Sequence, residues 1–188
     1  MKNRLTAGLC VALVVAALPA AAATFVHMDT QELIASSAAV VQGKVLDTRS
    51  FWNADRTVIV TQARVEVEDL VAGEAPAVVT VKTFGGQVGD YRVVAEGFPT
   101  FAAGDEVLLF LTADGADFRV TGHQLGDYRV RRTEKGLMAV PTLPDGVRLF
   151  REDGRLGPRP KVQELGALKA TIRARHETAI LHRTAGGR

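Results

Sequence analysis

Histidine and serine are the residue types in this chain that could bind a metal or act as a nucleophile. The spacings of the four histidines match no HExxH or HxH zinc motif; they are His27, His123, His176 and His182. None of the three serines lies in the G-x-S-x-G pattern of a hydrolase; they are Ser36, Ser37 and Ser50. The sequence therefore predicts no metal, no cofactor and no catalytic residue, and it favours a non-enzymatic protein.

Two aromatic pairs are the first candidates for a binding surface. Phe51 and Trp52 precede a polar turn, and Phe98 and Phe101 flank Pro99-Thr100. Buried, these side chains would close the end of a barrel, which is the more ordinary role for them. Exposed, they would be aromatic anchors for a partner.

A glycine pair is the third candidate. Gly85-Gly86 lacks the GxxxxGK[ST] phosphate-loop pattern and precedes no helix, so it predicts a turn that needs positive φ. Its functional interpretation is a loop whose backbone contacts a partner. The hypothetical partner-binding set is therefore Phe51, Trp52, Gly85, Gly86, Phe98 and Phe101.

Basic residues gather in the second half of the chain, where Arg129, Arg131 and Arg132 alternate around Tyr128 and Val130. Single-stranded nucleic acid can bind such surfaces, but acidic residues are interspersed, and we expect no nucleic-acid partner. A solvated face is the ordinary interpretation. The functional alternative is an envelope or matrix protein that binds an anionic polysaccharide through these three arginines.

The N-terminal segment has the layout of a secretory signal peptide. Lys2 and Arg4 form a basic start, an uncharged apolar run covers 9–18, and a proline then precedes an A-x-A site. We expect cleavage after Ala23 and a periplasmic or secreted protein that leaves the membrane; a retained membrane anchor is the alternative. Cleavage would leave 165 residues with 21 basic and 21 acidic side chains, and it would remove the only cysteine, Cys10.

The elements that must position the candidate side chains are mainly strands. Alternating apolar and polar residues over 57–67 predict a half-buried antiparallel strand. The apolar stretch 106–111 predicts a central strand covered on both faces, and Asp114-Gly115 predicts a hairpin after it. Further strands are expected at 39–46, 78–84, 118–121, 128–132 and 137–140.

Two helices complete the expected architecture. Asp29 and Glu32 have the spacing of a capping box before a short helix, and apolar residues recur at helical spacing near the C-terminus. The fold class expected is mainly β, an antiparallel OB-like barrel with these two helices. Its parts are a signal peptide (1–23), the barrel domain (24–141), a connector (142–161), a C-terminal helix (162–182) and a tail (183–188).

The order of these elements resembles a known superfamily. The stretches 38–45, 65–73 and 104–111 read AAVVQGKV, VEVEDLVAG and GDEVLLFL, and they are similar to netrin modules and tissue inhibitors of metalloproteinases. The resemblance covers the chain from Met28 to Thr121 and extends to exported bacterial proteins of unknown role. It implies an OB-fold barrel with flanking helices and a tendency to bind other proteins.

The resemblance does not extend to the device with which those inhibitors act. In them an N-terminal cysteine binds the protease zinc, whereas this mature chain would begin Thr24-Phe25-Val26-His27. No inhibitory residue carries over. We therefore expect an exported, non-enzymatic module that binds a protein through loops at one barrel end, with protease association as one form of that role.

Overall fold

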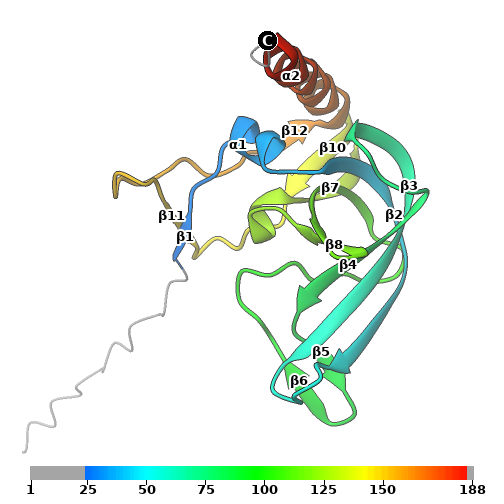
Figure 1. Cartoon of the computed structure of the whole chain (residues 1–188). Coiled ribbons are helices and arrows are strands. Elements are labelled where there is room, and N and C mark those ends of the chain that lie inside the picture. The colour runs from blue at the N-terminus through cyan, green and yellow to red at the C-terminus, as the bar shows by residue number, and fades with distance from the viewer. Residues whose placement is uncertain (1–23, 186–188) are drawn as a thin grey trace, which may run out of the picture.

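The computed structural model describes residues 24–185 of the 188-residue chain, and its architecture is mainly β (Figure 1). Eight strands form one sheet in the spatial order β12-β10-β9-β7-β2-β3-β4-β8. Because β8 also pairs with β7, the sheet closes on itself over part of its width. The expected signal peptide, 1–23, lies outside the described residues.

The closed part of the sheet is a five-stranded ring. Its strands are β2 (Ala39–Trp52), β3 (Ile59–Gly73), β4 (Val78–Phe84), β7 (Glu106–Asp114) and β8 (Asp117–Val120). Neighbouring strands in the ring are antiparallel except β4 and β8, which are parallel. The prediction of a mainly β, mainly antiparallel chain is confirmed, as is the hairpin that joins β7 to β8.

Two apolar cores share strand β7. Val107, Leu109 and Leu111 belong to the core inside the ring, and Leu108 and Phe110 belong to the core on the opposite face. All five side chains are 0 % exposed. A strand that is buried on both faces carries apolar residues at every position. The prediction that 106–111 forms a central strand covered on both faces is confirmed.

The second core lies between the sheet and the two helices. Helix α1 (Thr30–Ala35) contributes Leu33, and helix α2 (Leu165–Ala185) contributes Leu168 and Ile172. These side chains cover the outer faces of β2, β7, β9 and β10. This part of the outer face of the ring is therefore covered by the two helices.

Helix α1 begins with the predicted capping box. The Glu32 amide donates to the Asp29 carboxylate at 2.9 Å, and the Asp29 amide donates to the Glu32 carboxylate at 2.6 Å. Two amides that have no partner within the helix are thereby satisfied.

Helix α2 begins three residues after the predicted start at Val162. Gln163–Glu164 instead form the short strand β12, which pairs with β10. The Glu164 carboxylate then accepts hydrogen bonds from the amides of Gly166 and Ala167, at 2.9 and 2.6 Å. The residue whose side chain caps a helix precedes the helix. The strand β12 and the capping by Glu164 therefore place the start of α2 at Leu165.

The chain beyond the ring is more ordered than the sequence predicted. Strands β9 (Asp127–Thr133) and β10 (Gly136–Pro141) form the expected hairpin. The expected connector, 142–161, contains β11 (Arg148–Phe150), which pairs in parallel with β1 (Thr24–Val26). Figure 1 shows this pair beside the large sheet, at the left of the view.

A small hairpin begins at the predicted Gly85-Gly86 turn. It consists of β5 (Gly86–Val88) and β6 (Tyr91–Val93), and it lies at the far end of the long β2–β3 ribbon (Figure 1). Between Thr24 and Ala185, no helix has the length and apolar character needed to cross a membrane.

Candidate functional site

Trp52 lies at the end of β2 and is half-buried. Its ring packs edge-on against Tyr91 of β6, with 5.7 Å between the ring centroids. Tyr91 itself is 67 % exposed. The chain's own Tyr91 therefore covers one side of the tryptophan ring, and the surface beside it faces solvent.

Phe51 belongs to a row of apolar residues that crosses three strands. It pairs with Val60 of β3, which in turn pairs with Phe84 of β4. Residues paired across a sheet project from the same face. The row therefore forms an apolar strip that leads from Phe51 toward Phe84.

Gly85 and Gly86 have φ values of 90° and 128°, which favour glycine. A Cβ at Gly86 would lie 2.3 Å from Oγ1 of Thr61 and 2.4 Å from Oγ of Ser50. These two hydroxyls are themselves hydrogen-bonded at 2.8 Å. Backbone geometry and close packing thus account for the glycine pair.

Phe98 is the centre of an aromatic wall, a name used here for Phe84, Phe98 and His123. The ring of Phe98 meets Phe84 edge-on at a centroid distance of 4.9 Å and meets His123 edge-on at 4.6 Å. Edge-to-face contacts of this kind stabilise the packing of aromatic rings beyond the area they bury. The three rings come from β4, from a loop and from the 3-10 helix η1 (His123–Gly126) that follows β8, so only the folded chain brings them together.

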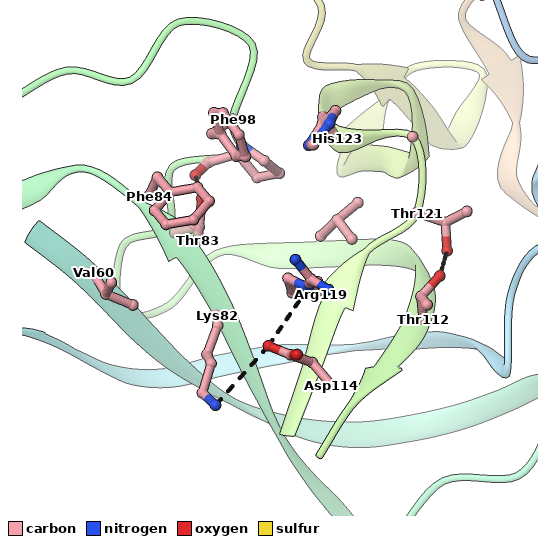
Figure 2. A pocket seen from close by; sticks show the side chains of 13 residues that line it. Val60, Lys82, Thr83, Phe84, Phe98, Thr112, Asp114, Arg119, Thr121 and His123 are labelled. Atoms are coloured by element: carbon pink, nitrogen blue, oxygen red, sulfur yellow. Dashed lines mark hydrogen bonds and ion pairs between the residues drawn. The ribbon is translucent and has the colours of Figure 1, made fainter. Parts of the chain in front are cut away.

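The aromatic wall borders a cavity of about 380 Å³ (Figure 2). Its other apolar lining residues are Val60, Pro99 and Val120. Its charged lining residues are Lys82, Asp114 and Arg119. The volume falls within the range of about 300–1,000 Å³ found for ligand pockets.

The charges beside the cavity form a balanced network, called here the charged cluster: Lys82, Asp114, Asp117 and Arg119. Nζ of Lys82 lies 2.9 Å from Oδ2 of Asp117 and 4.0 Å from Oδ2 of Asp114. Nε of Arg119 lies 3.5 Å from Oδ2 of Asp114. The hydrogen bond to Asp117 raises the pKa of Lys82 above its usual value. Two cations face two carboxylates, so the cluster carries no net charge.

His123 lines the cavity together with the aromatic residue Phe98 and the charged residue Arg119. Its backbone is left-handed, with φ 56°, and it follows Gly122 at φ 63°. Burial, and to a lesser extent the positive charge of Arg119, lower the pKa of the imidazole below its usual value. Near neutral pH the ring is therefore uncharged and serves as an aromatic surface and a hydrogen-bonding group.

Phe101 does not share the environment of Phe98. It packs against the core inside the ring, and the Arg129 guanidinium lies 5.3 Å from its centroid. Arg129 also forms ion pairs with Asp105 and Asp127. The two members of the second aromatic pair thus serve different sites.

The three candidate anion-binding arginines also differ from one another. The side chain of Arg129 is 12 % exposed, and its guanidinium is held by two carboxylates and by the carbonyl oxygen of Thr100. Arg131 and Arg132 are exposed. Arg129 therefore braces the loop before β7 against β9, and it is not presented to an external anion.

Asp127 is the most deeply buried charged residue near this brace, at 0 % exposure. Burial raises the pKa of its carboxyl group to about 6, against the opposing effects of Arg129 and of a hydrogen bond from Thr142. The sequence analysis did not single out this residue for binding. Its position inside the fold indicates a structural role.

The histidines and serines examined first are dispersed. Over residues 24–185, no three side chains of histidine, cysteine, aspartate or glutamate gather in a way that could hold a metal ion. Ser36 caps the C-terminus of α1, and the hydroxyl of Ser37 donates to the Leu33 carbonyl at 2.7 Å. These serines complete backbone and core hydrogen bonds.

The residues that the sequence analysis missed are those that define the cavity: Phe84, Lys82, Arg119 and His123. Alternation along 78–84 places Lys82 and Phe84 on the same face, and that signal was available. Residues 121–123 lie opposite Lys82 and Phe84 because β4 pairs in parallel with β8. No local sequence pattern predicts that pairing.

The chain matches no known protein family, no curated protein and no solved structure with which it was compared. The fold is a mainly β chain whose sheet is partly closed into a ring. A cavity lined by aromatic and charged side chains lies on the outer face of that ring.

Proposed function

We propose that this chain is an exported, non-enzymatic binding module that engages another protein through the cavity and the aromatic surface next to it. The observation that carries this proposal is the aromatic wall, which borders a solvent-accessible cavity. An apolar strip runs from it across Val60 to Phe51, on the same face of the sheet. Aromatic side chains arranged around a pocket are typical anchoring points of protein interfaces.

The ring order supports assigning the barrel to the OB-like class. A closed ring of five strands in which only one neighbouring pair is parallel is compatible with that architecture. OB-folds bind ligands on the face of their second and third strands and on nearby loops. Here these strands would be β3 and β4, which carry Val60 and Phe84 at the cavity. This correspondence is one of fold, so the residues at the site must support the function.

Export is part of the proposal and depends on the composition of the first 23 residues. A periplasmic or secreted location determines where a partner should be sought. N-terminal sequencing of the protein recovered from the envelope and from the culture medium tests it. A mature form that begins at Thr24 is expected, and recovery of the chain only in the cytoplasm with an intact Met1 would contradict it.

Affinity capture from envelope and culture-medium fractions tests the binding role. We compare the wild-type chain with Phe98→Ala, which removes the centre of the aromatic wall, and with Trp52→Ala. The control is Leu156→Ala, which removes an apolar side chain that is 58 % exposed and lies outside the cavity. Circular dichroism confirms that each variant is folded.

We expect a protein that the wild-type chain and Leu156→Ala retain and that Phe98→Ala loses. Removal of an interface anchor costs about 2 kcal/mol or more, which is a loss of about thirtyfold in affinity. If folded Phe98→Ala and Trp52→Ala both retain the same proteins as the wild-type chain, this surface is not the binding site and the proposal fails.

A further inference from the structure

We propose that the cavity recognises the C-terminal residue of a partner polypeptide, with its terminal carboxylate on Arg119 and an apolar side chain against the aromatic wall. This inference rests on the proposed binding function and names the chemistry of what is bound. It follows from the position of Arg119, from the balance of charge in the cavity and from the size of the cavity.

Arg119 is the cation of the charged cluster that has donors to spare. Its side chain is 56 % exposed, and its one ion pair among the described residues joins Nε to Asp114 at 3.5 Å. A guanidinium carries five N–H donors in a planar fork, so most of them face solvent at the cavity. Lys82, in contrast, is held by Asp117 at 2.9 Å.

The guanidinium and the aromatic wall line the same cavity. Figure 2 shows the Arg119 side chain between Asp114 and the group formed by Phe84, Phe98 and His123. The positive charge of Arg119 also contributes to the lowered pKa of His123, which agrees with this placement. A ligand that binds both features must therefore carry an anionic group close to an apolar one.

The charge balance selects a single carboxylate rather than a polyanion. Asp114 and Asp117 would repel additional negative charge, whereas one planar carboxylate matches the fork of one guanidinium. Because the cluster is neutral, added negative charge stays uncompensated, and a phosphate or a sulfated glycan would add more of it than a single carboxylate.

The size of the cavity selects a terminal residue. A volume of about 380 Å³ is near the lower end of the range for ligand pockets, which suits one amino-acid residue better than a long acyl chain. In a C-terminal residue, the carboxylate and the side chain are attached to the same Cα. Both groups can therefore enter one cavity, the carboxylate toward Arg119 and the side chain toward the aromatic wall. The backbone before that residue would extend over the surface toward Val60 and Phe51.

Binding of three probes tests this inference. The probes are the peptide acetyl-Gly-Gly-Phe with a free carboxylate, the same peptide with a C-terminal amide, and 3-phenylpropionate as a small carboxylic acid. Each is titrated into the full chain and into variants, and chemical shifts of the Arg119 side chain and the His123 amide are followed by NMR. Arg119→Gln removes the cation and the fork, and Arg119→Lys keeps the charge but removes the fork.

The matched control is Arg64→Gln. Arg64 is a surface arginine on β3 that is 54 % exposed and ion-paired to Asp47 at 3.1 Å, and it does not line the cavity. Both arginines are well exposed, so neither substitution removes core packing.

We expect the free peptide to bind about tenfold more tightly than its amide, which is the lower end for charge-assisted hydrogen bonds and suits a partly exposed arginine. Arg119→Gln should abolish this preference, Arg119→Lys should retain part of it, and Arg64→Gln should retain all of it. Equal binding of acid and amide, an acid preference that survives Arg119→Gln, or no binding of any probe up to about 20 mM would overturn the inference.

Two outcomes separate this inference from the proposed function. If 3-phenylpropionate binds as tightly as the free peptide, the cavity takes a small acid, and recognition of a polypeptide end is refuted. If capture of a protein depends on Phe98 but the probes bind independently of Arg119, the binding module stands and the carboxylate assignment is overturned.

Discussion

Replacing Asp127 with asparagine should change how the stability of this protein depends on pH. The carboxyl group is 0 % exposed, and burial raises its pKa from the ordinary value of 3.8 to about 6 despite the Arg129 guanidinium beside it. An asparagine side chain has nearly the same size and can still accept the hydrogen bond from Thr142, but it does not ionise.

The direction of the effect follows from proton binding. Between about pH 4 and about pH 6, the folded chain holds a proton on Asp127 that the unfolded chain has released. The stability that this proton contributes is complete below about pH 4 and is lost as the pH rises through about 6. A difference between pKa values of 3.8 and about 6 corresponds to about 3 kcal/mol in the free energy of unfolding.

Urea unfolding of the wild-type chain and Asp127→Asn between pH 4 and pH 7 measures this difference. The fluorescence of Trp52, the only tryptophan, reports the transition, and circular dichroism checks that it is two-state. Taking the difference between the two proteins at each pH cancels the groups that titrate in both. Asp47→Asn, which replaces a half-exposed carboxylate, controls for the substitution itself.

We expect the stability of the wild-type chain relative to Asp127→Asn to fall by about 2 kcal/mol between pH 4 and pH 7, because part of the full difference is already lost at pH 4, where the unfolded carboxyl group is more than half ionised. A relative stability that stays constant to within about 0.5 kcal/mol would refute the argument that burial dominates at this site. A relative stability that rises with pH would refute it more strongly, because it would mean that Arg129 lowers the pKa of Asp127 overall.

Two further predictions concern packing. Gly43→Ala should destabilise the protein by about 3 kcal/mol or more, because its Cβ would lie 2.0 Å from the Glu66 carbonyl oxygen; urea unfolding compares it with Gly146→Ala, where a Cβ meets nothing within 4 Å. Ile172→Ala should cost about 2–5 kcal/mol by opening a cavity under α2, whereas Leu181→Ala, at a 69 % exposed position, should change stability by less than about 0.5 kcal/mol. Equal effects within either pair would contradict the packing described here.

Local patterns were sufficient wherever the physical cause is local. Along β3, the two-residue period places Ile59, Ala63 and Val65 in the interior, as predicted, because successive side chains of a strand point to opposite faces. Gly43 in β2 lies at a register shift against β3, where a Cβ would meet the backbone of Glu66. The capping box and the Asp114-Gly115 hairpin were predictable for the same reason.

Short pairings between distant segments could not be predicted in this way. β1 and β11 each have three residues and are separated by more than 120 positions in the chain, so no periodic pattern could indicate that they pair. The start of α2 was misplaced for a related reason. Gln163 and Glu164 have side chains compatible with a helix, and only their pairing with Met138 and Ala139 of β10 makes them a strand.

How the candidate side chains lie in the folded chain depends on loop direction and on tertiary pairing, neither of which a local pattern shows. Phe98 and Phe101 lie three residues apart in a loop, where no period fixes which way a side chain points. The loop turns so that Phe98 meets His123 edge-on, while Phe101 packs against the core inside the ring near Arg129. Arg129 lies on β9, and it was considered for anion binding because the sequence does not reveal that Asp105 and Asp127 approach it. Strand alternation placed Lys82 and Phe84 together, whereas only tertiary pairing supplied the arginine and the histidine opposite them. A search for binding residues in chains of this kind should therefore begin from the outward-facing residues of the ring strands and then ask which loops lie over them.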